Sequence, residues 1–108
     1  MTAKKYFVGL DLGQASDYMA LSVLEKAAAE GNEAIYHLRD LQRIRGLPYP
    51  KISEKVAAIM QSPPLAGNAA LVVDQTGVGA PVVDLLRSGG LKLAAISIHG
   101  GDKVSKEN

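Results

Sequence analysis

Cysteine is absent from this chain, so it can form neither a disulfide framework nor a thiolate metal site, and oxygen ligands are favoured. Charge of one sign is also scarce, because twelve Lys and Arg face eleven Asp and Glu for a formal net charge of +1. No global field therefore attracts nucleic acid or an anionic membrane, and any contact with DNA has to be local. No apolar run is long enough for a signal peptide or a membrane span, so we expect a cytoplasmic protein without membrane association.

A chain of 108 residues has room for one small domain with a single core. Apolar residues make up 47% of it and charged residues 21%, which is typical of a folded globular protein and excludes a low-complexity chain. We expect the domain to span residues 1–99. The polar segment 100–108 has no apolar residue except Val104 and is expected to be a flexible tail.

The hydrophobic pattern predicts three strands, a helix, a strand, a second helix and a last strand. The predicted strands cover Tyr6–Leu12, Tyr18–Leu24, 34–44, Ala69–Val73 and Leu91–Ile98, and the predicted helices contain Ile52–Met60 and Pro81–Leu86. Tight connections favour antiparallel pairing of the first three strands, whereas helical crossovers favour parallel neighbours. The expected fold is therefore an α/β domain with a mixed five-stranded sheet.

Two aspartates stand at the ends of hydrophobic stretches: Asp11 in Phe7–Gly13 and Asp74 in Ala70–Gly79. A carboxylate at the end of a buried strand is costly to desolvate unless it holds a cation, a substrate group or a turn. If the fourth strand pairs beside the first, both aspartates lie near the same sheet edge. They would then supply hard oxygen ligands to Mg²⁺. Either aspartate taken alone is explained as well by a hydrogen-bonded turn.

Three segments of the chain resemble the nuclease domain of phage terminase large subunits. They are Gly9–Gly13 followed by Asp17–Leu21, then Leu41–Ile44 with Gly46–Pro50, and Val73–Gly79. The resemblance implies a ribonuclease H-like fold and a metal-dependent endonuclease that cuts DNA during genome packaging. It places the first catalytic, metal-binding carboxylate at Asp11 and the second at Asp74, with Mg²⁺ or Mn²⁺ as cofactor.

The same resemblance implies partners for the protein and a further acidic residue of the nuclease domain that this chain lacks. Double-stranded DNA is the expected substrate, and the terminase ATPase domain, the small terminase subunit and the portal are expected partners, all in the cytoplasm of a bacterial host. The chain contains no phosphate loop of the packaging ATPase. The family also carries a further acidic residue near or within a later helix, which has no counterpart here, so we expect a partial nuclease domain.

Further polar residues are candidates for the same site. Asp17 lies across a tight loop from Asp11 and could orient a metal-bound water, although a turn role is the simpler interpretation. Four basic residues could meet DNA phosphates, but scattered cations equally form a solvated face. These are Arg39, Arg43, Arg45 and Lys51.

Two other classes of function remain open from the sequence. Gly9–Gly13 also resembles the first phosphate loop of actin-like ATPases, and the Thr76–Gly79 turn before a helix could expose amides to a phosphate. A dinucleotide fingerprint fails in Gly77–Val82, which lacks the third glycine. The other class is a noncatalytic ribonuclease H-like interaction module, which would form a homodimer through an uncovered apolar sheet face. Metal affinity at the two aspartates separates the nuclease from this module.

Overall fold

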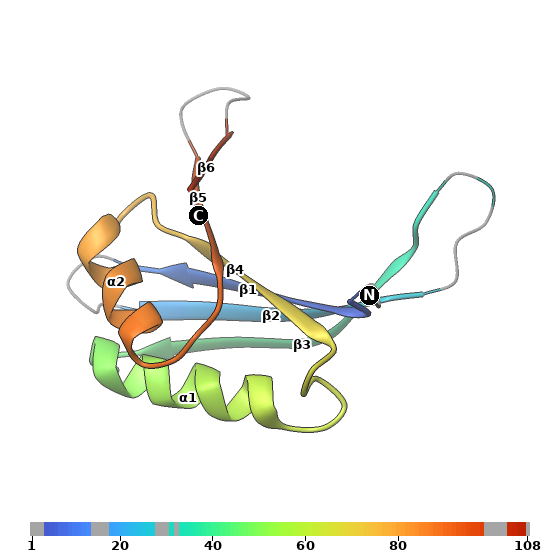
Figure 1. The fold of residues 1–108 in the computed structure, drawn as a ribbon, viewed down its shortest axis with the longest axis horizontal. Coiled ribbons are helices and arrows are strands. Elements are labelled where there is room, and N and C mark those ends of the chain that lie inside the picture. The colour runs from blue at the N-terminus through green and yellow to red at the C-terminus, as the bar shows by residue number, and fades with distance from the viewer. Residues whose placement is uncertain (1–3, 14–17, 28–30, 32, 99–103, 108) are drawn as a thin grey trace.

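A six-stranded sheet organises the computed structural model, which describes residues 4–13, 18–27, 31, 33–98 and 104–107 (Figure 1). The elements are β1 (Tyr6–Leu12), β2 (Tyr18–Lys26), β3 (Tyr36–Arg45), α1 (Tyr49–Gln61), β4 (Ala69–Asp74), α2 (Ala80–Ser88), β5 (Ala94–Ile98) and β6 (Val104–Glu107). The strand order is β3-β2-β1-β4-β5-β6. Strand β1 pairs antiparallel with β2 and parallel with β4, so it occupies the middle of the sheet.

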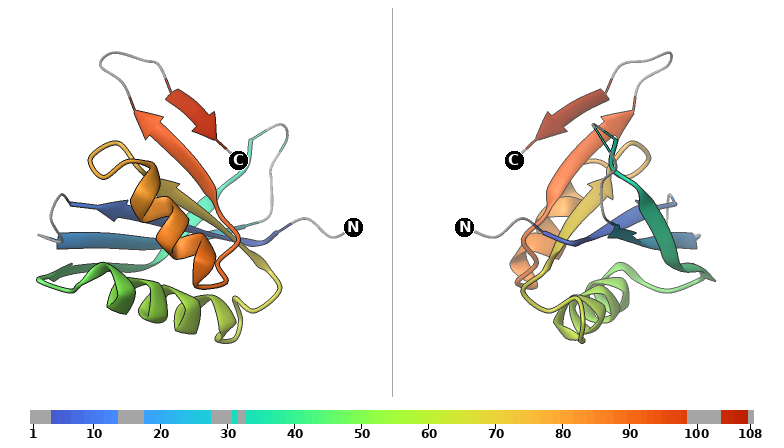
Figure 2. Two further views of the ribbon diagram at one scale, coloured as in Figure 1. Left: turned by 60° about the vertical axis from the view of Figure 1, so that its left-hand side comes forward. Right: turned by 90° about the vertical axis from the view of Figure 1, so that its right-hand side faces the viewer.

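Both helices lie on one face of the sheet, and the alternation of β1 shows which side chains meet them (Figure 2). The even-numbered residues from Tyr6 to Leu12 are buried in the core, whereas Phe7, Gly9 and Asp11 belong to the opposite face. Because successive strand residues alternate between faces, one strand both builds the core and presents polar groups on the far side. No helix of the described residues covers that far side, which we call the open face.

The core is formed between the sheet and the inner sides of α1 and α2. Its fully buried side chains are Val8, Leu10, Met19, Leu21, Ile52, Val56, Val73, Val83 and Leu86. Helix α1 begins at Tyr49, directly after Pro48 and with Pro50 in its first turn, where a missing backbone N–H costs nothing. Helix α2 likewise carries Pro81 in its first turn.

The predicted fold class is confirmed, because three antiparallel strands are followed by two parallel strands reached through helical crossovers. Strand β5 is shorter than predicted and begins at Ala94 rather than at Leu91. The amide of Leu91 donates to the carbonyl of Leu86 at 3.3 Å and closes the end of α2. A residue whose backbone completes a helix end cannot also join the ladder of the sheet.

The segment predicted as a flexible tail contains an additional strand. Val104–Glu107 form β6, which pairs antiparallel with β5 in a register that places Ile98 opposite Val104. The outer edge of β5 offers unpaired backbone groups, and pairing with β6 satisfies them although the segment is polar. The other residues of 100–108 lie outside the described part. Neither helix of the described residues has the length and apolar character that crossing a membrane requires.

Candidate metal centre

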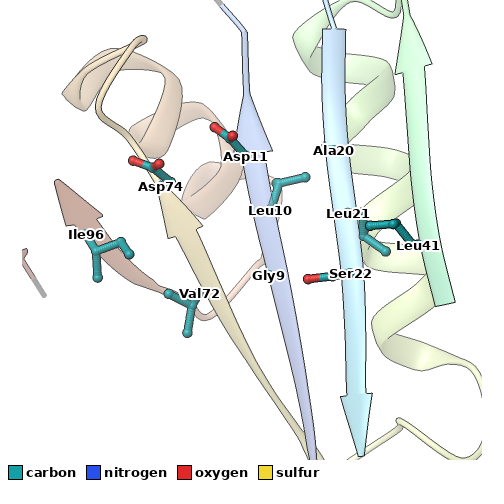
Figure 3. A pocket seen from close by; sticks show the side chains of 10 residues that line it. All are labelled: Gly9, Leu10, Asp11, Ala20, Leu21, Ser22, Leu41, Val72, Asp74 and Ile96. Atoms are coloured by element: carbon teal, nitrogen blue, oxygen red, sulfur yellow. The ribbon is translucent and has the colours of Figure 1, made fainter. Parts of the chain in front are cut away.

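Asp11 and Asp74 are direct neighbours in the sheet. The parallel register of β1 and β4 places them opposite each other, with their backbones about one strand spacing, about 4.8 Å, apart. Figure 3 shows both carboxylates at the ends of their adjacent strands, and both belong to the open face. The prediction that the fourth strand pairs beside the first and brings the two aspartates together is confirmed. Their role as metal ligands stays a prediction.

Burial and the neighbouring charge of Asp74 act together on Asp11. The pKa of Asp11 is raised above its usual value, first by partial desolvation and then by the negative charge of Asp74. Both causes disfavour the ionised form, and a cation between the two carboxylates would relieve both. The electrostatics of the pair therefore favour the binding of a positive group.

A local turn fixes the orientation of Asp74. Its Oδ1 accepts hydrogen bonds from the Thr76 amide at 2.9 Å and from the Thr76 hydroxyl at 2.5 Å. The same hydroxyl oxygen accepts a bond from the Ile98 amide at 2.7 Å, which ties the turn to the end of β5. The turn role of Asp74 is thus real. It does not compete with a metal role, because both bonds go to Oδ1 and a carboxylate has a second oxygen with lone pairs of its own.

A shallow hollow of about 220 Å³ lies on the open face beside the two aspartates. Its walls include Leu41, Val72 and Ile96, and its floor includes Gly9 (Figure 3). A Cβ at Gly9 would lie only 3.0 Å from the hydroxyl of Ser22, so the absence of a side chain there both permits the packing of the two strands and keeps the hollow open. A substrate group could approach the carboxylates over this apolar floor.

One of the four predicted basic residues lies in the same row as the two carboxylates. Asp11 is opposite Ala20, and Ala20 is opposite Arg43, so Arg43 lies two strands from Asp11, about 10 Å across the open face. The guanidinium carbon of Arg43 lies 4.6 Å from the ring centroid of Tyr18. Stacking on the ring restrains the long side chain and leaves the edge of the guanidinium free for an anion.

The remaining cations are distributed differently. Arg45 is paired with Tyr18 and shares this end of the sheet, whereas Arg39 lies at the opposite end, where it forms an ion pair of 2.6 Å with Glu25. The structure therefore does not bring Arg39 together with the aspartates, because Arg39 lies at the end of the sheet that is far from Asp11 and Asp74. Lys51 is in the first turn of α1, next to Glu54 at 3.4 Å.

The described residues contain no group of three Asp, Glu, His or Cys side chains suited to hold a metal ion. Asp17, predicted as an outer-shell residue, lies outside the described residues. The Thr76 hydroxyl and the Tyr18 ring are neighbours to which the sequence analysis gave no part in the metal centre. The spacing of two residues from Asp74 to Thr76 is a turn signal that points to Thr76, whereas nothing local links Tyr18 to Arg43.

The glycine-rich turn after β4 has few free donors for a phosphate. The amides of Val78 and Gly79 donate to the carbonyl of Gln75 at 3.1 Å and 2.8 Å, and the Thr76 amide is bonded to Asp74. In the other glycine-containing loop, the amide of Gly13 donates to the carbonyl of Tyr18 at 2.7 Å. Because a phosphate loop works by aiming free N–H groups at the ligand, these bonded amides are not available to a phosphate.

Comparison with solved structures finds the same fold in other proteins. The chain superposes on the Thermus thermophilus RuvC structure with a TM-score of 0.58 at 13% identity, covering 85% of this chain and 63% of that one. It also matches the Aquifex aeolicus PPX-GPPA enzyme, with a TM-score of 0.51 at 9% identity, covering 85% of this chain and 36% of that one. The chain thus spans less than two thirds of either protein. No protein-family model and no curated protein matches the sequence.

At these identities the matches establish architecture alone. Together with the strand order they show that the chain has the ribonuclease H-like fold. The donor set at the end of β1 and β4 suits a hard divalent cation, because Mg²⁺ is commonly held by one or two carboxylates while waters and substrate phosphate complete its shell. Asp11 and Asp74 would hold such a cation.

Proposed function

We propose that this chain is part of the nuclease domain of a phage or prophage terminase large subunit, and that the complete nuclease domain cleaves double-stranded DNA with Mg²⁺ or Mn²⁺ held by Asp11 and Asp74. The observation that carries the proposal is the register of β1 and β4, which sets two carboxylates side by side at one sheet end. The likeness to RuvC, a ribonuclease H-like nuclease, supports a nuclease-type function in general. The terminase assignment rests on the sequence resemblance.

Each residue of the site has a separate task in this proposal. A bound divalent cation would neutralise charge on the scissile phosphate and activate water for attack. Asp11 and Asp74 anchor that positive charge, and Thr76 holds Asp74 in its orientation through Oδ1. Arg43, restrained by Tyr18, contacts a neighbouring phosphate of the same strand. The hollow above Gly9 admits the sugar or base next to the cleaved bond.

The partners follow from the same assignment. Double-stranded DNA is the substrate, and the terminase ATPase domain, the small subunit and the portal deliver it during packaging. With a net charge of only +1, the domain has little long-range attraction for DNA of its own. Delivery by partners would supply the local concentration that the charge of this domain does not.

Cleavage of supercoiled plasmid by the complete nuclease, in the presence of Mn²⁺, tests the proposal. We expect Asp11→Asn and Asp74→Asn to lower the cleavage rate at least about a hundredfold, because each removes a ligand charge while keeping side-chain shape. Asp84→Asn, an exposed carboxylate on α2, is the matched control and should cleave like the wild type.

Cleavage that persists unchanged in Asp74→Asn would overturn the assignment of the site. A protein that neither binds Mn²⁺ nor cleaves DNA would instead favour the interaction module.

A further inference from the structure

Exposed apolar side chains concentrate along the free edge of β3. Of the six large hydrophobic residues that are exposed in the described part of the chain, four precede or belong to this strand: Ile35, Tyr36, Leu38 and Leu41. Strand β3 is ten residues long, contains no proline and forms one edge of the sheet (Figure 1). A long edge strand offers a row of unpaired backbone groups to another strand, and exposed apolar side chains along it favour such pairing. The opposite edge, β6, has only four residues.

A bulge in β3 decides which of its side chains share a face. Leu38 is opposite Leu24 and Leu41 is opposite Ser22, so both leucines belong to the open face. In a regular strand, residues three apart would lie on opposite faces. The register shift at Val23 and Leu24 leaves one additional residue in β3, and this brings the two leucines onto one side.

The two charged residues between the leucines also share a face. Asp40 is opposite the buried Val23, which belongs to the side that carries the helices. Arg39 reaches Glu25 on the same side, with 2.6 Å between its Nε and the Oε1 of Glu25. The centre of β3 thus reads Leu38-Arg39-Asp40-Leu41, with leucines on one face and opposite charges on the other.

We propose that β3 pairs antiparallel with β3 of a second copy of this chain, with a twofold axis between Arg39 and Asp40. Reversing the order of this segment places each leucine opposite a leucine and each arginine opposite an aspartate. Arg39 then faces the partner's Asp40 on the helix side, and Leu38 faces the partner's Leu41 on the open side. Each of these pairs occurs twice, as in any isologous interface.

The charge of the edge explains why a second copy suits it better than an arbitrary strand. Strand β3 carries three arginines against one aspartate, so a matching partner strand has to place an anion opposite Arg39 and a cation opposite Asp40. The second copy meets this requirement, because the partner's Asp40 lies opposite Arg39 and the partner's Arg39 lies opposite Asp40. The guanidinium of Arg39 has five donors and can bond Glu25 and the partner's aspartate together. This interface uses the strand edge and is distinct from pairing through the open face.

Sedimentation equilibrium over a series of protein concentrations tests the proposal. The wild type should show a reversible monomer–dimer equilibrium. Asp40→Arg places arginines opposite each other twice and should raise the dimer dissociation constant about tenfold. Asp84→Arg makes the same charge change on the exposed side of α2 and should leave the constant unchanged. A wild type that stays monomeric throughout, or equal weakening by both variants, would overturn the proposal.

The absence of cysteine allows a direct test of the register. The double variant Leu38→Cys/Leu41→Cys should form a disulfide-linked dimer under mild oxidation much faster than either single variant, because only the double variant places two thiols opposite each other. Equal rates in the double and single variants would contradict this register. Circular dichroism of each variant confirms that it is folded.

Discussion

At the scale of single residues, Asp11 connects stability with function. Its pKa is raised by burial and by Asp74, so the folded state binds a proton more tightly than the unfolded chain and ionisation weakens the fold. This penalty is absent below the ordinary carboxylate pKa and complete above the raised pKa. A residue whose ionisation weakens the fold in this way is typical of a binding site.

Asp11→Asn should therefore raise the free energy of unfolding at neutral pH, by up to about 0.5 kcal/mol for a partly exposed group screened by solvent. The difference from the wild type should vanish below about pH 4, the ordinary range of a carboxylate, where Asp11 is protonated in both the folded and the unfolded state. Urea unfolding at a series of pH values measures it. If Asp11→Asn is less stable than the wild type at pH 7, the carboxylates do not repel each other as described.

The pKa of Glu25 is shifted in the opposite direction to that of Asp11, so its ionisation stabilises the fold. Hydrogen bonds from Arg39, Lys5 and Tyr6 hold its pKa at about 2, below the usual 4.5. Its contribution to stability is complete above about pH 4.5 and is lost as the pH falls towards 2. We expect Glu25→Gln to lower the unfolding temperature at pH 7 and to match the wild type near pH 2, as thermal unfolding followed by circular dichroism would show. A pH-independent difference would contradict this origin.

At the scale of elements, strand bounds were predicted most accurately where buried and exposed residues alternate strictly along the strand. The pattern of β1 predicts the bounds of the strand and shows that Asp11 lies near its end. The pattern of β4 likewise shows that Asp74 lies at the end of that strand. Strand β3 was predicted two residues early, at 34, because it is exposed along most of its length and no core face marks its start. The pairing of β6 and the stacking of Arg43 on Tyr18 depend on contacts between distant segments, which local patterns do not record.

The contact between α1 and α2 depends on a glycine. A Cβ at Gly89 would lie 2.6 Å from the Oγ of Ser53, so Gly89→Ala should lower the free energy of unfolding by about 1–3 kcal/mol, the range for overpacking. Because the clash is with the hydroxyl, Ser53→Ala should restore most of the loss in the double variant. Chemical unfolding of the two single variants and the double variant measures the coupling; additive effects would mean that the two residues do not meet.

At the scale of the whole molecule, the fold divides its tasks between two faces. The helices cover one face and supply stability, while the open face carries the aspartates, the hollow and Arg43. The net charge of +1 gives this face no general attraction for DNA, so single cations should have measurable effects.

We expect Arg43→Gln to weaken DNA binding and to reduce the slope of log affinity against log salt concentration by about one, the effect of one lost phosphate contact. Lys92→Gln removes the same charge before β5, at the far end of the sheet, and should leave the slope unchanged. Fluorescence anisotropy with a labelled duplex in Ca²⁺ measures both. Equal slopes in Arg43→Gln and the wild type would remove Arg43 from the DNA contact.

The claim that Asp11 and Asp74 together hold a divalent cation is tested most directly by a Mn²⁺ titration followed by NMR. We predict paramagnetic broadening of the amides around the ends of β1 and β4, lost in Asp11→Asn and in Asp74→Asn but retained in Asp84→Asn. Broadening that is absent, or that survives in both site variants, would contradict the metal centre and the nuclease function built on it.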